Sequence, residues 1–91
     1  MARSVGPILS RSAATEAVID AIRACTREVT VVDRGAYVRV SADRECRVSR
    51  SAIEEKLGAP FRLPQDLEPI MPSFSGKLSI DAEGAVWRWR E

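Results

Sequence analysis

Residues that could perform chemistry are sparse in this chain of 91 residues. It has no histidine, the commonest general base and the usual ligand of zinc, copper and non-haem iron. Cys25 and Cys46 have neither a C-x-x-C partner nor an imidazole to activate them, so we expect two buried thiols. The acidic pairs Glu54–Glu55 and Asp66 with Glu68 are more simply interpreted as solvated side chains than as an acid–base pair. These residues predict a protein that is not an enzyme.

Two tryptophans near the carboxyl end allow two interpretations. Trp87 and Trp89 fall on one face of a predicted strand, with Arg88 and Arg90 on the other. Such a pair could stack nucleobases, as in single-strand binders. We favour core packing, because the chain has few aromatic residues and a small domain needs most of them inside. A net charge of +1 also provides no general attraction to nucleic acid or to an anionic membrane.

The remaining candidates suit protein binding. Phe74 lies among small polar residues in P-S-F-S-G (72–76), where it either forms an exposed anchor on a loop or turns back into the core. Tyr37 and Arg39 are predicted on the polar face of a strand, where they either anchor an interface or simply cover a half-wet sheet. The residues alone leave both questions open.

The first half of the chain predicts a strand, a helix and three further strands. Residues 5–9 favour a strand, with Pro7 indicating an edge position. Ser12 is a candidate N-cap for a helix whose apolar residues recur every three or four positions up to Cys25. Residues 28–33, 36–42 and 45–49 predict strands, and Gly35 marks a tight turn between the first two.

The second half predicts the same order with a longer connector. The pattern S-x-x-E at Ser51–Glu54 predicts a capping box, and Gly58 predicts the end of that helix. A proline-spaced connector follows, and then strands at 77–81 and 85–90. We therefore expect an α/β (α+β) fold of two βαββ-like units in one compact domain, with two main helices on small, mostly antiparallel sheets.

Length and hydropathy predict one domain over residues 5–91, preceded by a short tail of residues 1–4. No apolar run approaches the roughly 20 residues needed to span a bilayer, and the amino terminus does not resemble a signal peptide. We therefore expect a cytoplasmic protein.

Three segments carry a family resemblance: D-R-G-A-Y-V-R-V (33–40), A-I-E-E-K-L-G-A-P-F (52–61) and P-S-F-S-G (72–76). Their order and spacing resemble the effector, or coupling, proteins of bacterial multicomponent diiron monooxygenases, most closely the toluene/alkene branch. The resemblance extends from about Val5 to Trp89. No long amino-terminal tail like that of the soluble methane monooxygenase effector precedes the predicted first strand.

The resemblance implies a non-catalytic protein without a cofactor that docks on a diiron hydroxylase. It would reshape the hydroxylase active site and couple oxygen activation and electron supply to hydroxylation or epoxidation. A reductase, and in many such systems a Rieske-type ferredoxin, would supply the electrons. The residues implied at the interface are Pro72, Ser73, Phe74, Ser75 and Gly76, together with Tyr37 and Arg39. The alternatives are a generic α/β adaptor and a small nucleic-acid-binding module that uses Trp87, Trp89 and the arginines.

Overall fold

Two helices and two small antiparallel sheets make up the described part of the protein. The computed structural model describes residues 3–90. Their elements, in chain order, are β1 (Ser4–Ser10), α1 (Thr15–Cys25), β2 (Thr30–Asp33), β3 (Tyr37–Asp43), β4 (Glu45–Ser49), α2 (Arg50–Leu57), the 3₁₀ turn η1 (Glu68–Ile70), β5 (Ser73–Ser75), β6 (Lys77–Ile80) and β7 (Gly84–Arg88). The expected tail of residues 1–4 lies partly outside the described residues, and β1 begins at Ser4.

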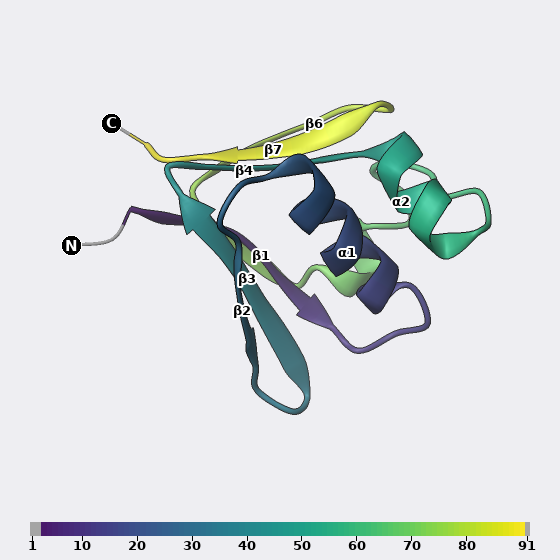
Figure 1. Cartoon of the computed structure of the whole chain (residues 1–91), viewed down its shortest axis with the longest axis horizontal. Coiled ribbons are helices and arrows are strands. Elements are labelled where there is room, and N and C mark those ends of the chain that lie inside the picture. Colours follow the sequence, from purple (N-terminus) through teal and green to yellow (C-terminus); the bar gives the residue numbers. More distant parts are fainter. Residues whose placement is uncertain (1–2, 91) are drawn as a thin grey trace.

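Each sheet is built mainly from one half of the chain, except that β5 from the second half joins the first sheet. The first has the order β2-β3-β1-β5 and the second β4-β7-β6. α1 lies between them, and the two sheets diverge around it (Figure 1). The predicted α+β class is confirmed, and β1-α1-β2-β3 is the expected first βαββ unit. The second half differs because its connector forms an additional strand, β5, which joins the sheet of the first half.

Strand β1 is a central strand, so the edge position predicted from Pro7 is wrong. β1 pairs with β3 on one side and with β5 on the other. Its ladder with β3 has bridges at Val5 and Ile8 but none at Gly6 and Pro7 between them. Proline has no N–H to donate, and Gly6 (φ +145°) comes so close to β3 that a Cβ would lie 2.3 Å from the Val40 carbonyl oxygen.

Helix α1 buries the apolar stripe predicted from its spacing, including the fully buried Val18 and Ile22. The predicted N-cap at Ser12 is wrong, because α1 begins at Thr15 and its N-cap position is Ala14. Ser12 instead shapes the preceding turn: its Oγ accepts a hydrogen bond from the Ala14 N–H at 3.2 Å.

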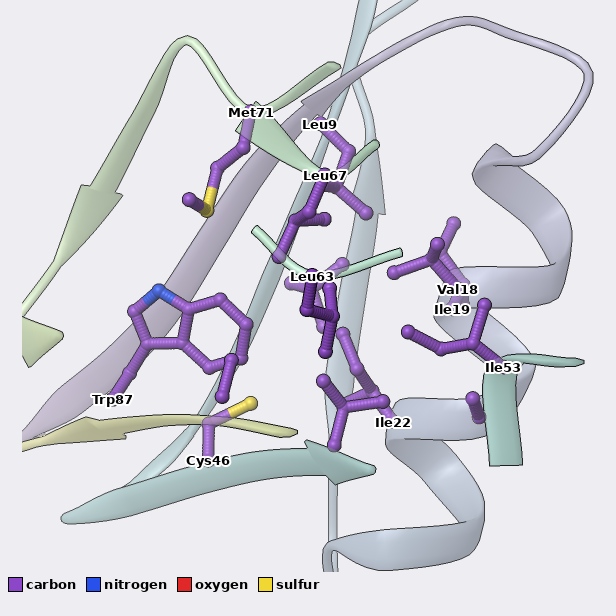
Figure 2. Packing of buried hydrophobic residues seen from close by; sticks show 14 of the residues in the cluster. Leu9, Val18, Ile19, Ile22, Cys46, Ile53, Leu63, Leu67, Met71 and Trp87 are labelled. Atoms are coloured by element: carbon purple, nitrogen blue, oxygen red, sulfur yellow. The ribbon is translucent and has the colours of Figure 1, made fainter. Parts of the chain in front are cut away.

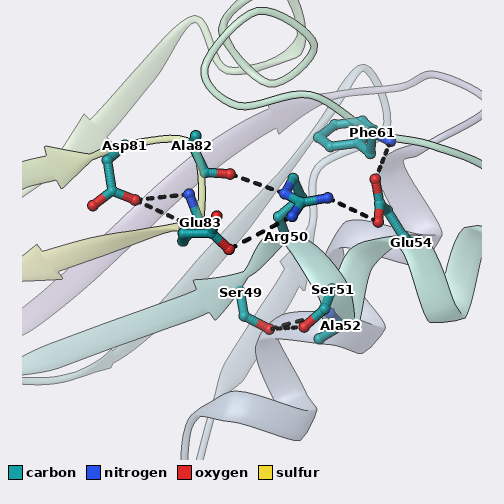
Figure 3. A network of polar contacts seen from close by, with 10 residues as sticks. Ser49, Arg50, Ser51, Ala52, Glu54, Phe61, Asp81, Ala82 and Glu83 are labelled. Carbon is teal, nitrogen blue, oxygen red and sulfur yellow. Dashed lines mark hydrogen bonds and ion pairs between the residues drawn. The ribbon is translucent and has the colours of Figure 1, made fainter.

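Helix α2 begins at Arg50, two residues earlier than a cap at Ser51 predicts. The N-cap is Ser49, the last residue of β4, whose Oγ accepts from the Ala52 N–H at 3.1 Å. The capping box predicted at Ser51 is therefore wrong. Glu54, its expected acidic member, accepts instead from Arg50 Nη1 (3.1 Å) and from the Phe61 N–H (2.9 Å), as Figure 3 shows. The predicted helix end at Gly58 is confirmed, with φ +74°.

Arg50 joins α2 to the β6–β7 hairpin. Its Nε donates to the Ala82 carbonyl at 3.0 Å, and its Nη2 lies 3.5 Å from the Glu83 carboxylate (Figure 3). Helix α2 and the second sheet are thereby joined through one side chain.

The connector between α2 and β5 contributes to the hydrophobic core. Its prolines interrupt any regular spacing of apolar residues, so the sequence did not predict this burial. Phe61, Leu63, Leu67 and Met71 are all buried. Leu63, Leu67 and Met71 lie beside Trp87 at the centre of the molecule (Figure 2). Trp87 is fully buried and is the cross-strand partner of the buried Cys46.

A side chain covers the free edge of β4 at Arg47. Thr26 Oγ1 donates to the Arg47 carbonyl at 2.8 Å and accepts from the Arg47 N–H at 2.9 Å. One hydroxyl thus satisfies both backbone groups that a neighbouring strand would otherwise pair. Among residues 3–90, no helix has the length and apolar character needed to cross a membrane.

Replacement of Gly6 by alanine tests the close contact between β1 and β3. We expect Gly6→Ala to lower the free energy of unfolding by roughly 2–4 kcal/mol, because its Cβ would clash with the Val40 carbonyl at a φ that favours glycine. Gly35→Ala is the matched control, since Gly35 also has a positive φ but nothing within 4 Å of its Cβ position. It should cost only about 1 kcal/mol. Equal losses for the two variants in chemical denaturation would contradict the contact.

Candidate partner-binding surface

Phe74 is exposed, and it lies on a strand rather than on the predicted loop. It is the middle residue of β5, opposite Pro7 of β1. Pro7 is fully buried on the core side of the sheet, so the register directs Phe74 to that side as well. Because β5 is the edge strand, the ring is nevertheless 41% exposed. Phe74 is thus a half-exposed aromatic at a sheet edge, and its role as an anchor for a partner stays a prediction.

The outer face of the first sheet brings two other candidates together. Ile8 of β1 lies opposite Arg39 on one side and Ser73 on the other. Cross-strand partners project to the same face, so these three side chains and Val32, the β2 partner of Arg39, form one row. Ile8 and Val32 are half-buried although they face away from the core. Neither was a candidate from the sequence, because their neighbours became known only with the strand order.

The adjacent row on this face contains only small residues. Thr30 lies opposite Ser41, and Gly6 lies opposite Ser75. The Cβ position of Gly6 is 3.2 Å from the Ser41 Cα, which places these four residues in one line across the sheet. A partner could therefore approach close to the backbone along this row, with Arg39 beside it for ionic contact.

Tyr37 lies apart from the Phe74 edge, next to the tip of the β2–β3 hairpin, and is also 41% exposed. Arg11 holds this tip: its guanidinium pairs with Asp33 and its Nε donates to the Gly35 carbonyl at 3.0 Å. Asp33 in turn accepts from the Gly35 N–H at 2.8 Å. The hydrogen bond from Arg11, followed by that from Gly35, lowers the pKa of Asp33 below its ordinary value.

The ends of the 72–76 segment serve different purposes. Pro72 is exposed just before β5. Gly76 (φ +95°) allows the chain to turn from one sheet into the other, because a Cβ there would lie 2.7 Å from both the Arg88 carbonyl oxygen and Val5 Cγ1. These close contacts explain why position 76 is a glycine without any reference to a partner.

The two tryptophans have different environments, so the expectation that both anchor the core is only half correct. Trp87 is 0% exposed and Trp89, beyond the end of β7, is 41% exposed. The alternation of buried and exposed side chains ends with β7 at Arg88, and the sequence did not predict that the strand stops before Trp89. A platform that stacks bases on both rings is also ruled out, because no base can reach Trp87.

The groups with chemical potential are occupied or inaccessible. Burial raises the pKa of the Cys46 thiol to about 11, which keeps it protonated. Glu54 is bound by Arg50 and the Phe61 N–H, and Asp66 by the N–H of Arg62 at 2.7 Å. Within the described range 3–90, no three cysteine or carboxylate side chains gather closely enough to hold a metal ion.

Comparisons with known proteins give a consistent result. The MmoB/DmpM family matches residues 3–88. A protein of Xanthobacter autotrophicus described as "Alkene monooxygenase system, effector subunit" is 40% identical over 88 residues, which cover 94% of this chain and 86% of that protein.

Solved structures share the fold at lower identity. A chain in a structure of the phenol hydroxylase–regulatory protein complex superimposes with a TM-score of 0.84 at 18% identity, covering 96% of this chain and 99% of that one. The soluble methane monooxygenase regulatory protein B gives 0.72 at 21% identity, covering 99% of this chain and 67% of that one.

The Arg11–Asp33 pair predicts the acid behaviour of the hairpin tip. In an NMR titration of the Asp33 carboxyl carbon, we expect the wild-type midpoint below 3.8 and a higher midpoint in Arg11→Gln. Because the folded-state pKa is depressed, the pair stabilises the fold above the unfolded-state pKa, and this contribution is lost as the pH falls through the folded value. Lys56→Gln, an exposed change on α2, should leave the midpoint unchanged. An unchanged midpoint in Arg11→Gln would mean that the pair does not form.

Proposed function

Because the chain belongs to the MmoB/DmpM family, we propose that it is the effector subunit of a multicomponent monooxygenase. The observation that carries this proposal is the 40% identity to an alkene monooxygenase effector subunit over 94% of the chain. The absence of histidine and the engagement of Glu54 and Asp66 in structural hydrogen bonds support a role without catalysis. We place the protein in the cytoplasm, with no cofactor of its own.

Its partner is the diiron hydroxylase of the same system, which a reductase, and in some systems a Rieske-type ferredoxin, supplies with electrons. The outer face of the β2-β3-β1-β5 sheet is the surface we propose for docking. The small residues of one row, Thr30, Ser41, Gly6 and Ser75, permit close approach, and Arg39 and Ser73 lie in the next row. Phe74 at the β5 edge and Tyr37 at the hairpin end provide exposed aromatic anchors on either side.

The mechanism is a population shift in the hydroxylase. The effector stabilises an active geometry only as far as it binds that geometry more tightly than the resting one. An interface of about 800 Å² per partner is ordinary for such a complex. A stiff sheet suits this task, because little binding free energy is spent on ordering the effector. Hydroxylation or epoxidation is then coupled more tightly to oxygen activation.

Titration of this protein into the reconstituted hydroxylase and its electron-transfer components tests the role. We expect product formation to rise to saturation near one effector per active site, with more product per NADH consumed. A flat titration with folded protein, together with no complex on a sizing column, would leave only a generic adaptor role.

Phe74→Ala tests the docking surface. We expect the effector concentration for half-maximal activation to rise about tenfold or more, because truncating an aromatic anchor at an interface typically costs that much affinity. The free energy of unfolding should change by less than about 1 kcal/mol, because much of the ring is solvent-exposed. Glu55→Ala is the control, since Glu55 is an exposed residue of α2 that lies outside both sheets. If both variants lose activation equally, or if Phe74→Ala unfolds, the assigned surface is wrong.

A further inference from the structure

The outer face of the β4-β7-β6 sheet carries a second, separate cluster of charged side chains. Arg88 of β7 lies opposite Glu45 on one side and Lys77 on the other. Val86, in the next row of this face, lies opposite Arg47 and Ser79. These residues alternate with Cys46 and Trp87, which point into the core, so the cluster faces outward.

The cluster is cationic because one carboxylate is shared between two guanidiniums. Glu45 lies 3.2 Å from Arg88 Nε and 2.8 Å from Arg47 Nη2. Lys77 in the same row and Arg90 just beyond the strand add further positive charge. The net charge of the whole chain, +1, therefore conceals an excess of cations at the end of this face that Lys77, Arg88 and Arg90 line.

The same face is hollowed. A depression of about 460 Å³ is lined by residues that include Arg47, Val86 and Arg88. A second one, of about 350 Å³, extends from Arg88 to Trp89 and Arg90, and the two share Ser79 and Arg88. Cations, a half-buried valine and a half-exposed tryptophan thus line two adjoining depressions.

We propose that this surface binds an acidic segment of a partner protein. Its carboxylates would pair with Lys77, Arg88 and Arg90, and an apolar residue between them would lie against Val86 and the Trp89 ring. Bidentate arginine–carboxylate pairs and an aromatic at the end of a groove are the features that recognise such a segment. The inference does not depend on the docking role of the first sheet, since no residue is shared with that surface.

The distribution of acidic groups favours a protein segment over a nucleic acid. Glu45 lies within the cationic row, and Asp81 and Glu83 line the far end of the larger depression. A continuous phosphate backbone would meet these carboxylates, whereas the spaced carboxylates of a peptide avoid them. Trp89 also offers only a single ring for stacking, since Trp87 is fully buried.

Fluorescence anisotropy with a short fluorescein-labelled peptide of glutamate and leucine tests the proposal. We expect binding to the wild-type protein at low salt that weakens as salt is added. Lys77→Glu should weaken it on the order of tenfold, because a cation of the groove becomes a repelling carboxylate. Lys56→Glu on α2 makes the same change of charge away from the groove and should leave the affinity unaltered. Trp89→Ser should also weaken binding.

Three results would overturn the proposal. They are no binding of the peptide at low salt, equal affinities for Lys77→Glu and Lys56→Glu, and tighter binding of a single-stranded oligothymidylate than of the peptide. A glutamine–leucine peptide serves as the uncharged control and should not bind. Circular dichroism of each variant establishes that it is folded, so that any loss of binding is assigned to the surface.

Discussion

The architecture depends on two close backbone contacts that only glycine permits. At Gly6, β1 approaches the Val40 carbonyl of β3 while pairing with β5 on its other side. At Gly76, the chain passes from β5 into β6 against Val5 and the Arg88 carbonyl. The first contact brings β1 close to β3, and the second lets the chain pass from β5 in one sheet to β6 in the other. The proposed docking surface follows from them, because its row of small residues includes Gly6 and its exposed phenylalanine lies on β5.

Periodicity in the sequence predicted most elements, and the resemblance of three ordered segments indicated the family. The errors arose where contacts with neighbouring elements, rather than the local pattern, decide the structure. The strands β3 and β4 and the helix α1 were predicted correctly because their buried residues recur with the fixed period of a strand or a helix. Both N-caps were predicted at the wrong residue, because a serine can cap a helix only where the backbone brings a free N–H close to its hydroxyl. In α2 the Ala52 N–H reaches the hydroxyl of Ser49, and Ser51 is not the cap. Pro7 was predicted at a sheet edge because proline lacks the N–H that a central strand normally donates. The sequence does not show that the β1–β3 ladder has no bridge at this position. The core role of Leu63, Leu67 and Met71 was hidden by intervening prolines and the absence of a regular period.

The candidate surface was predictable as residue types but not as geometry. Phe74 and Tyr37 are exposed, as an anchor must be, yet the register places Arg39 and Ser73 on one face and directs Phe74 toward the other. The added members, Ile8 and Val32, require knowledge of the strand order. The second sheet carries its own charged outer face, so the molecule presents two surfaces of different chemistry. A rigid body with two distinct faces is suited to a protein whose effect is exerted through what it contacts.

The Thr26 hydroxyl that covers the edge of β4 at Arg47 has a consequence for solubility. An open strand edge is a template on which a second copy of the chain can continue the sheet, and growth of that kind has no natural end. Thr26 occupies both backbone groups of Arg47 with a single side chain, without adding a strand or a loop. Loss of this one oxygen would leave the core intact and expose a pairing edge beside a hollowed face. At Arg47, two copies of the chain would then have free backbone groups through which to pair edge to edge.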